Sequence, residues 1–325
     1  MKYQQKDLEK FPHQIEFAIS KYKKHNLLVQ DYSNVVLAGL GGSGIAGKIV
    51  KTYFQKISPI PIEVISDYKL PQYVDAKTLV ILNSYSGNTE ETLSCYMDSL
   101  EKHAKSLVIT TGGILHELAK ENKIKCYFAE KGFQPRMALG YSLTYLFLIL
   151  GEFYGKTLTT ELKKVVVKLT NTDYYIDKAK IYFCGLNPAN SQKWIILADT
   201  LSFPVGTRFA QQVNENAKGE AFVHDLPEAC HNVIETYNRH LDSVFVFLYA
   251  THGPRLNHRF NFMEKLLNQH NQSVLRLNLK EFNLIHIYET IYVLDWLSLL
   301  IADKKKIVSN EIPNINSLKE FMKGK

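Results

Sequence analysis

Short apolar runs alternate with longer, helix-like stretches through the first half of the chain. After a helical region over residues 1–30, runs that predict strands cover residues 35–38, 62–65, 78–83, 106–110 and 126–129. Stretches at about 45–54 and 90–103 are expected to be helices. Short apolar strands that alternate with helices are typical of a parallel sheet covered on both faces.

The same pattern restarts in the second half. A long apolar helix is expected over about 135–153, and a polar stretch rich in lysine and threonine follows over 155–173. We then expect a strand, a helix, three more strands and a final helix, over residues 181–185, 189–203, 221–224, 243–249, 273–277 and 284–302. The sequence predicts an α/β fold of two similar, doubly wound domains, residues 1–154 and 155–325, each a parallel sheet flanked by helices.

Composition narrows the class of protein. With 325 residues, 46% of them hydrophobic and 22% charged, the chain is large enough for two domains with buried cores. The net charge of +7 favours anionic partners. The densest basic block, Lys304-Lys305-Lys306, follows a predicted helix, where cations are favoured in any case. We therefore expect no nucleic-acid partner.

Cysteines and apolar stretches bear on the compartment. The four cysteines have no CxxC or zinc-type spacing, so we expect buried free thiols, a reducing compartment and no metal site: Cys95, Cys126, Cys184 and Cys230. The first ten residues contain no apolar signal core. The apolar run at 141–150 is short for a membrane span, and the one at 291–301 carries Asp295. A soluble cytoplasmic protein without a membrane partner is expected.

A glycine-rich loop follows the first predicted strand and opens a helix. Its sequence is Gly39-Leu40-Gly41-Gly42-Ser43-Gly44, and such a loop presents backbone N–H groups and a helix dipole to an anion. The same glycines satisfy G-x-G-x-x-G, and Asp67 lies just past the second strand, as in dinucleotide-binding enzymes. From the loop alone, three alternatives stay open. They are a phosphate site, an NAD site, and a tight turn that binds no ligand.

The end of the third predicted strand favours the phosphate site. It reads Ser84-Tyr85-Ser86-Gly87-Asn88-Thr89, and carboxyl ends of parallel strands share one edge of the sheet. Three further hydroxyls, those of Ser84, Ser86 and Thr89, are therefore expected beside the Ser43 loop. Asn88 and Glu91 have the spacing of a capping box, which would explain some of these residues but not a serine at both strand ends.

Both strings resemble the sugar isomerase (SIS) domain. Four later segments are similar to the bifunctional phosphoglucose/phosphomannose isomerase branch of that superfamily: Gln134-Pro135-Arg136, Asn214-Glu215-Asn216-Ala217-Lys218, Pro227-Glu228 with His231-Asn232, and Ile315 with Leu318-Lys319. The resemblance extends from about residue 33 to the end of the chain. It implies two SIS domains and a homodimer whose sites lie near the subunit interface.

The resemblance also implies roles for individual residues. The substrate phosphate would be bound by Gly42, Ser43, Ser84, Ser86 and Thr89. Glu215 would be the catalytic base, and Arg136 would lie near the C1–C2 oxygens. His231 would assist ring opening in the neighbouring subunit's site, and Lys319 would be the C-terminal lysine of the site. Taken singly, Glu215 could begin a helix and His231 could be structural; as an ordered set they favour function.

Isomerisation chemistry agrees with this set. An aldose becomes a ketose when a proton moves between C1 and C2 through a cis-enediol. The reaction needs a carboxylate as base and then acid, a cation over the developing oxyanion, and a histidine for the ring oxygen. It needs neither a metal nor a redox cofactor. The resemblance therefore implies interconversion of glucose-6-phosphate and fructose-6-phosphate, with mannose-6-phosphate as a second substrate.

Some positions depart from the family pattern. Ser191-Gln192-Lys193-Trp194 stands near the place of an expected Arg-Trp-Lys helix, and Val233 replaces a glutamate. The segment Ile312-Pro313-Asn314 lacks the threonine or serine found near C1–C2 in the family. These departures leave the base and the phosphate site untouched, and we expect them to bear on substrate choice and on rate. The alternatives are a non-catalytic, sugar-phosphate-binding SIS regulator, although no appended DNA-binding module is visible, and an NAD-dependent enzyme.

Overall fold

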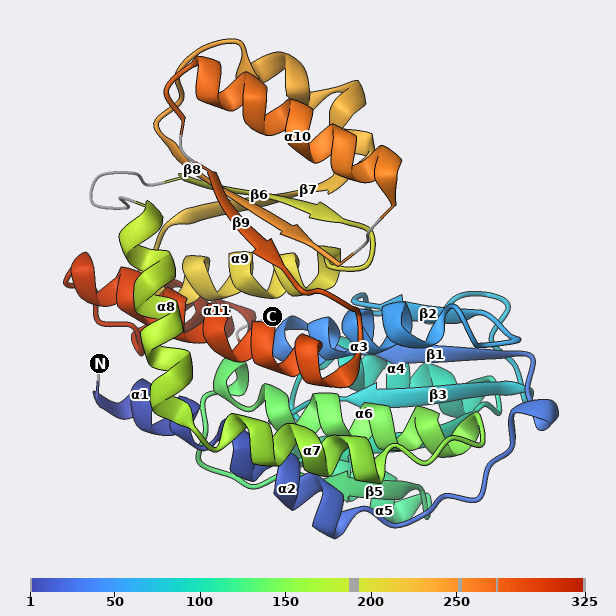
Figure 1. The fold of residues 1–325 in the computed structure, drawn as a ribbon. Helices are drawn as coiled ribbons and strands as arrows, with labels where there is room; N and C mark the ends of the chain where they lie inside the picture. The colour runs from blue at the N-terminus through green and yellow to red at the C-terminus, as the bar shows by residue number, and fades with distance from the viewer. Residues whose placement is uncertain (1, 187–192, 251–252, 273, 324–325) are drawn as a thin grey trace. The chain divides into compact units, whose positions relative to one another are not determined.

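The chain folds into two α/β units, each with its own parallel sheet (Figure 1). The computed structural model describes residues 2–186, 193–250, 253–272 and 274–323. We call Glu9–Asn171 with Phe282–Glu289 the N-terminal unit, and Met1–Leu8 with Thr172–Glu281 and Thr290–Lys325 the C-terminal unit. The domain boundary after residue 154 stays a prediction.

The N-terminal unit contains a five-stranded parallel sheet with the order β2-β1-β3-β4-β5. Its strands are β1 (Asn34–Ala38), β2 (Ile62–Ile65), β3 (Thr78–Asn83), β4 (Lys105–Thr110) and β5 (Lys125–Phe128). Its helices are α2 (Phe11–Lys21), α3 (Gly41–Phe54), α4 (Glu90–Glu101), α5 (Gly113–Glu121), α6 (Leu139–Phe153) and α7 (Thr159–Leu169), with short 3₁₀ turns η1 (Val29–Asp31) and η2 (Pro135–Met137). The strands expected in this half of the chain are confirmed.

Helices cover both faces of this sheet because its strands are apolar on both sides. Every residue of β3 is buried. Side chains alternate across a strand, so Val80 and Leu82 pack with Tyr96 of α4 and Leu115 of α5. On the other side of the unit, α6 packs against α2 and α3 and is buried along nearly its whole length. The site loops at the strand ends therefore rest on a rigid core.

The C-terminal unit contains a four-stranded parallel sheet with the order β7-β6-β8-β9. Its strands are β6 (Lys193–Asp199), β7 (Glu220–Leu226), β8 (Ser243–Tyr249) and β9 (Val274–Asn278). The helices of this unit are α8 (Thr172–Leu186), α9 (Phe203–Ala217), α10 (Pro254–Gln269), α12 (Pro313–Lys323) and most of α1 (Lys2–Glu9) and α11 (Leu284–Lys304), with 3₁₀ turns η3 (Glu228–His231) and η4 (Val233–Tyr237). Two parallel sheets flanked by helices confirm the predicted fold class.

The first strand and helix expected in this unit are wrong. Residues 181–185 belong to the last turns of α8, where Ile181 is 70% exposed, and residues 193–199 of the expected helix form strand β6 instead. Residues 187–192, with the loop at Asn187-Pro188, lie outside the described residues. A short apolar run fits a buried strand and a helix equally well, so the pattern there did not separate the two.

The cysteines differ in exposure. Cys95 is buried, and burial raises the pKa of its thiol to about 11, as it does for the half-buried Cys126. Cys184 is exposed on α8, which contradicts the expectation that all four thiols are buried. All four are free thiols.

Among the described residues, one helix, α11, is long and apolar enough to cross a membrane. Of its apolar window, 72% is buried inside the protein, as expected for a core helix. Asp295 of α11 is buried with Arg208 of α9, and the two make a two-pronged ion pair with N–O distances of 2.8 and 3.2 Å. Farther along α9, Asn216 donates to Ser298 at 2.9 Å. These bonds fix α9 to α11.

The buried pair gives a test of this anchoring. Asp295→Asn removes the carboxylate opposite Arg208, and breaking a buried pair from one side costs about 3–5 kcal/mol. We expect the melting temperature in scanning calorimetry to fall by roughly 10 °C. Asp177→Asn is the matched control, because the Asp177–Lys180 pair is exposed on both sides and exposed pairs contribute little. Equal small shifts for both variants would show that the buried pair does not hold α9.

Candidate active site

Strands β1 and β3 bring the two predicted phosphate strings together. They are neighbours in the sheet, with Ala38 opposite Leu82, so the chain after each strand emerges at the same edge. The two backbones are so close that a Cβ on Gly39 would lie 2.8 Å from the Asn83 carbonyl oxygen. Helix α3 begins at Gly41, earlier than expected, so residues 41–44 form its first turn.

Asn83 connects the Ser43 turn to the rest of the unit. Its side-chain amide donates to the Ser43 carbonyl at 3.1 Å and accepts from the Ser142 hydroxyl of α6 at 3.0 Å. Asn83 is itself buried. Asn83 was not among the residues predicted for the site, although an asparagine at the end of an apolar strand is a usable signal.

The loop after β3 places its hydroxyls around the start of α4. The hydroxyls of Ser84 and Thr89 lie 2.9 Å apart, and the Gly87 N–H donates to Ser84 Oγ at 3.1 Å. Ser84 is buried, whereas Ser86 is exposed and accepts from the Asn88 N–H at 3.2 Å. Thr89 occupies the N-cap of α4 without a side-chain capping bond. The hydroxyls of Thr89 and Ser84 thus lie next to each other at the start of α4.

The capping box that the spacing of Asn88 and Glu91 left open as an alternative does not form at α4. Asn88 does not cap α4; its side-chain oxygen accepts from the Ile114 N–H at 3.0 Å, at the start of α5. This long-range bond fixes the loop after β3 to the loop after β4. It leaves the start of α4 available to an anion.

Arg136 lies beside the glycine-rich turn. A Cβ on Gly42 would approach the Pro135 carbonyl oxygen to 3.1 Å and the Arg136 Cα to 3.7 Å. Arg136 belongs to η2 and is buried. The structure therefore gathers Gly42, Ser43, Ser84, Thr89 and Arg136 at one edge of the first sheet, with Ser86 in the same loop.

The other predicted residues belong to the C-terminal unit. Glu215 is half-buried in the last turn of α9, not at a helix start, and the Lys218 ammonium donates to its carbonyl and to that of Glu311. His231 is exposed at the end of η3, and Lys319 is exposed on α12. Glu215 precedes the amino end of β7, whereas His231 follows its carboxyl end. The structure does not bring these two residues of one chain together.

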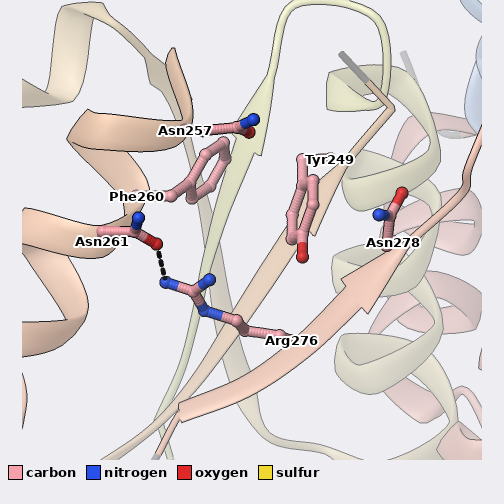
Figure 2. Close-up of a pocket in the computed structure, with 6 residues that line it drawn as sticks. All are labelled: Tyr249, Asn257, Phe260, Asn261, Arg276 and Asn278. Carbon is pink, nitrogen blue, oxygen red and sulfur yellow. Dashed lines mark hydrogen bonds between the residues drawn. The ribbon is translucent and has the colours of Figure 1, made fainter. Parts of the chain in front are cut away.

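A pocket of about 270 Å³ lies elsewhere in the C-terminal unit, between α10 and strands β8 and β9 (Figure 2). Asn257, Phe260 and Asn261 line it from α10, and Tyr249, Arg276 and Asn278 from the strands. The Arg276 guanidinium already contacts Asn261 at 2.8 Å and Glu264 at 2.7 Å. No predicted site residue lines this pocket, so it is separate from the candidate active site.

Comparison with known proteins agrees with this geometry. A family model described as the SIS domain matches residues 28–132, and one described as the bacterial phospho-glucose isomerase C-terminal SIS domain matches residues 189–322. A bifunctional phosphoglucose/phosphomannose isomerase from Caldicellulosiruptor bescii is 32% identical over 325 residues, covering 95% of each chain. The chain belongs to the bifunctional phosphoglucose/phosphomannose isomerase family. Membership confirms the resemblance and makes the chain an isomerase.

Two further proteins help to place this family member. The solved structure of a hypothetical protein from Thermus thermophilus has a TM-score of 0.77 at 17% identity, covering 98% of this chain and 89% of its own, and so shares the fold. A relative named D-glucosamine-6-phosphate 4-epimerase, from Sulfolobus acidocaldarius, is 33% identical over 219 residues, covering 67% of this chain and 68% of its own. Similar sequences in this group thus carry two different activity names.

Two glycines allow a matched test of the loop geometry. Gly41 and Gly87 both have positive φ, 52° and 71°, so alanine at either costs about 1–2 kcal/mol in backbone strain. A Cβ on Gly41 meets nothing within 4 Å, whereas one on Gly87 would lie 1.8 Å from the Gly112 carbonyl oxygen. We expect Gly41→Ala to lower the melting temperature slightly and Gly87→Ala to lower it much more. Equal shifts would mean that the Gly87–Gly112 contact does not constrain the loop.

Proposed function

We propose that this isomerase interconverts glucose-6-phosphate and mannose-6-phosphate with fructose-6-phosphate, through a cis-enediol and without a metal or redox cofactor. The observation that carries the proposal is the group of hydroxyls at the first turns of α3 and α4, with Arg136 against Gly42. Hydroxyls and helix N–H groups suit a phosphomonoester, and a buried arginine suits an oxyanion beside it.

Each residue then has one task. Ser43, Ser84, Ser86, Thr89 and the backbone at Gly42 hold the phosphate. Glu215 takes a proton from C2 of the open-chain aldose and returns it to C1, a second proton moves from O2 to O1, and Arg136 stabilises the enediolate oxygen in between. His231 gives a proton to the ring oxygen as the ring opens and takes one back when it closes. Lys319 supplies a second cation at the site.

The places of Glu215 and His231 in one chain support a homodimer. They flank β7 at opposite ends, and a strand of seven residues is roughly 20 Å long. A single site that uses both groups therefore takes His231 from a neighbouring subunit. We further propose a cytoplasmic location. Thiols stay reduced in the cytoplasm, and phosphosugars are metabolised there.

The epimerase relative favours one second candidate, epimerisation of an amino-sugar phosphate at C4. Both reactions would use the same phosphate site but different carbons of the substrate. The departures at Val233 and at Ile312-Pro313-Asn314 concern substrate choice, and so they bear on this alternative. Incubating the protein with glucosamine-6-phosphate and following C4 by NMR would detect such an activity directly.

Glucose-6-phosphate and mannose-6-phosphate should both be accepted, at unequal rates. The two sugars differ only in configuration at C2 and give the same enediol after C2 deprotonation. A hydrogen bond missing near C1–C2 costs on the order of 1 kcal/mol, or roughly five- to tenfold in rate. We expect turnover of both in a coupled assay that contains EDTA. A ratio of kcat/KM beyond about a thousandfold would defeat the dual-substrate proposal, and no turnover of either would defeat isomerisation.

Glu215→Gln should keep the fold and lower kcat by about 10²–10⁴-fold, because glutamine keeps the shape but removes the base. Glu220→Gln is the matched control: this glutamate is exposed at the start of β7, and its variant should retain wild-type activity.

Mixed dimers test the shared site. Glu215→Gln and His231→Ala protomers, each inactive alone, should regain activity when unfolded and refolded together, because one site of a mixed dimer then holds both intact groups. An active monomer in sedimentation analysis would contradict the arrangement.

A further inference from the structure

Tyr85 stands between two of the proposed phosphate-binding serines, yet its side chain reaches a different loop. Its hydroxyl donates to the Glu130 carbonyl at 2.8 Å and accepts from the Phe133 N–H at 3.1 Å. One phenol oxygen thus bridges both ends of the turn at residues 130–133, in which Gly132 has a φ of 103°. This turn leads directly into Pro135 and Arg136.

The main chain of Tyr85 is also fixed. Its carbonyl oxygen accepts from the N–H and the hydroxyl of Thr111, at 3.0 and 2.8 Å. The adjacent Ser84 N–H donates to the Ile109 carbonyl at 3.0 Å. Tyr85 therefore reaches toward the Arg136 segment from a rigid position at the sheet edge.

A second set of bonds holds the far side of the same turn. The Tyr141 hydroxyl donates to the Glu130 carboxylate at 2.5 Å, and His13 lies 2.8 Å from the same oxygen. Burial raises the pKa of Glu130, but the bonds from Tyr141 and His13 outweigh it, and the pKa lies below its ordinary value. Farther on, the Gln14 amide donates to the Met137 carbonyl at 2.7 Å.

We propose that Tyr85 is a positioning residue that sets the distance between the phosphate loop and Arg136. The proposal rests on the proposed function, in which the phosphate binds beside Tyr85 and Arg136 stabilises the enediolate. The substrate has to be held at its phosphate and at its carbonyl end at the same time, so the protein groups that bind the two ends need a set separation. The Tyr85 hydroxyl gives a direct hydrogen-bonded link between the loop after β3 and the turn that leads into Arg136.

Tyr85→Phe removes the link and leaves every proposed phosphate ligand in place. We expect KM to stay within about threefold and kcat to fall about 10- to 100-fold, because a small misplacement of a charged group costs that much. Tyr145→Phe is the matched control. Its hydroxyl also donates to a backbone carbonyl, that of Phe128 at 2.7 Å, but it is not bonded to the turn at 130–133. Its kcat should stay within about twofold.

Two inhibitors separate positioning from loss of structure. Glucitol 6-phosphate has the phosphate but no carbonyl, whereas 5-phosphoarabinonate carries a carboxylate where the enediolate forms. We expect Tyr85→Phe to leave the Ki of the first within about twofold and to raise that of the second at least about tenfold. Glu130→Gln weakens the bonds of the Glu130 side chain to Tyr141 and His13, which hold the same turn. This variant should show the same selectivity between the inhibitors to a smaller degree, and it replaces Tyr85→Phe if that variant fails to fold.

Each outcome decides the matter. An unchanged kcat, or equal weakening of both inhibitors, overturns the positioning role. If the wild type lacks isomerase activity, the proposed reaction fails, but selective loss of 5-phosphoarabinonate binding in Tyr85→Phe still supports the link. If the wild type binds neither inhibitor, the phosphate site and this inference both fail.

Discussion

The candidate site depends on the close approach of two pairs of backbones at the edge of the first sheet. Gly39 lies against the Asn83 carbonyl and Gly87 against the Gly112 carbonyl, with no room for a Cβ at either place. Because β1 and β3 are adjacent and parallel, their following turns meet there. These two close backbone contacts constrain the positions of the site groups. The groups are the hydroxyls, the starts of α3 and α4, and the Arg136 segment.

Those features of the fold that are local in sequence could be predicted. Strands such as β3 are apolar throughout and bounded by turn residues, so their positions follow from the residues themselves. Residues 181–185 and 193–199 show the limit, because both are apolar and only tertiary packing decides which becomes a strand. The exposure of Ile181 on α8 has no counterpart in the local pattern.

The meeting of the two phosphate strings at one sheet edge was predictable, but the hydrogen bonds that connect them to the rest of the unit were not. The bonds from Asn83 to Ser142, from Tyr85 to the 130–133 turn and from Gln14 to Met137 join positions far apart in the chain. No local motif specifies such partners. Asn88 is the clearest case. Its spacing to Glu91 favours a cap on α4, but its side-chain oxygen accepts from the Ile114 N–H at the start of α5 instead.

In the C-terminal unit, the proposed catalytic base and the segment that departs from the family pattern lie in different surroundings. Glu215 lies on α9, which is anchored to α11 through the buried Arg208–Asp295 pair and the Asn216–Ser298 bond. The departing segment around Pro313 opens α12, whose described residues are exposed. Sequence changes at such exposed positions cost little stability, whereas changes around α9 would disturb a buried ion pair. If Glu215 is the base, as proposed, sequence changes in this exposed segment cost less stability than changes around the carboxylate do.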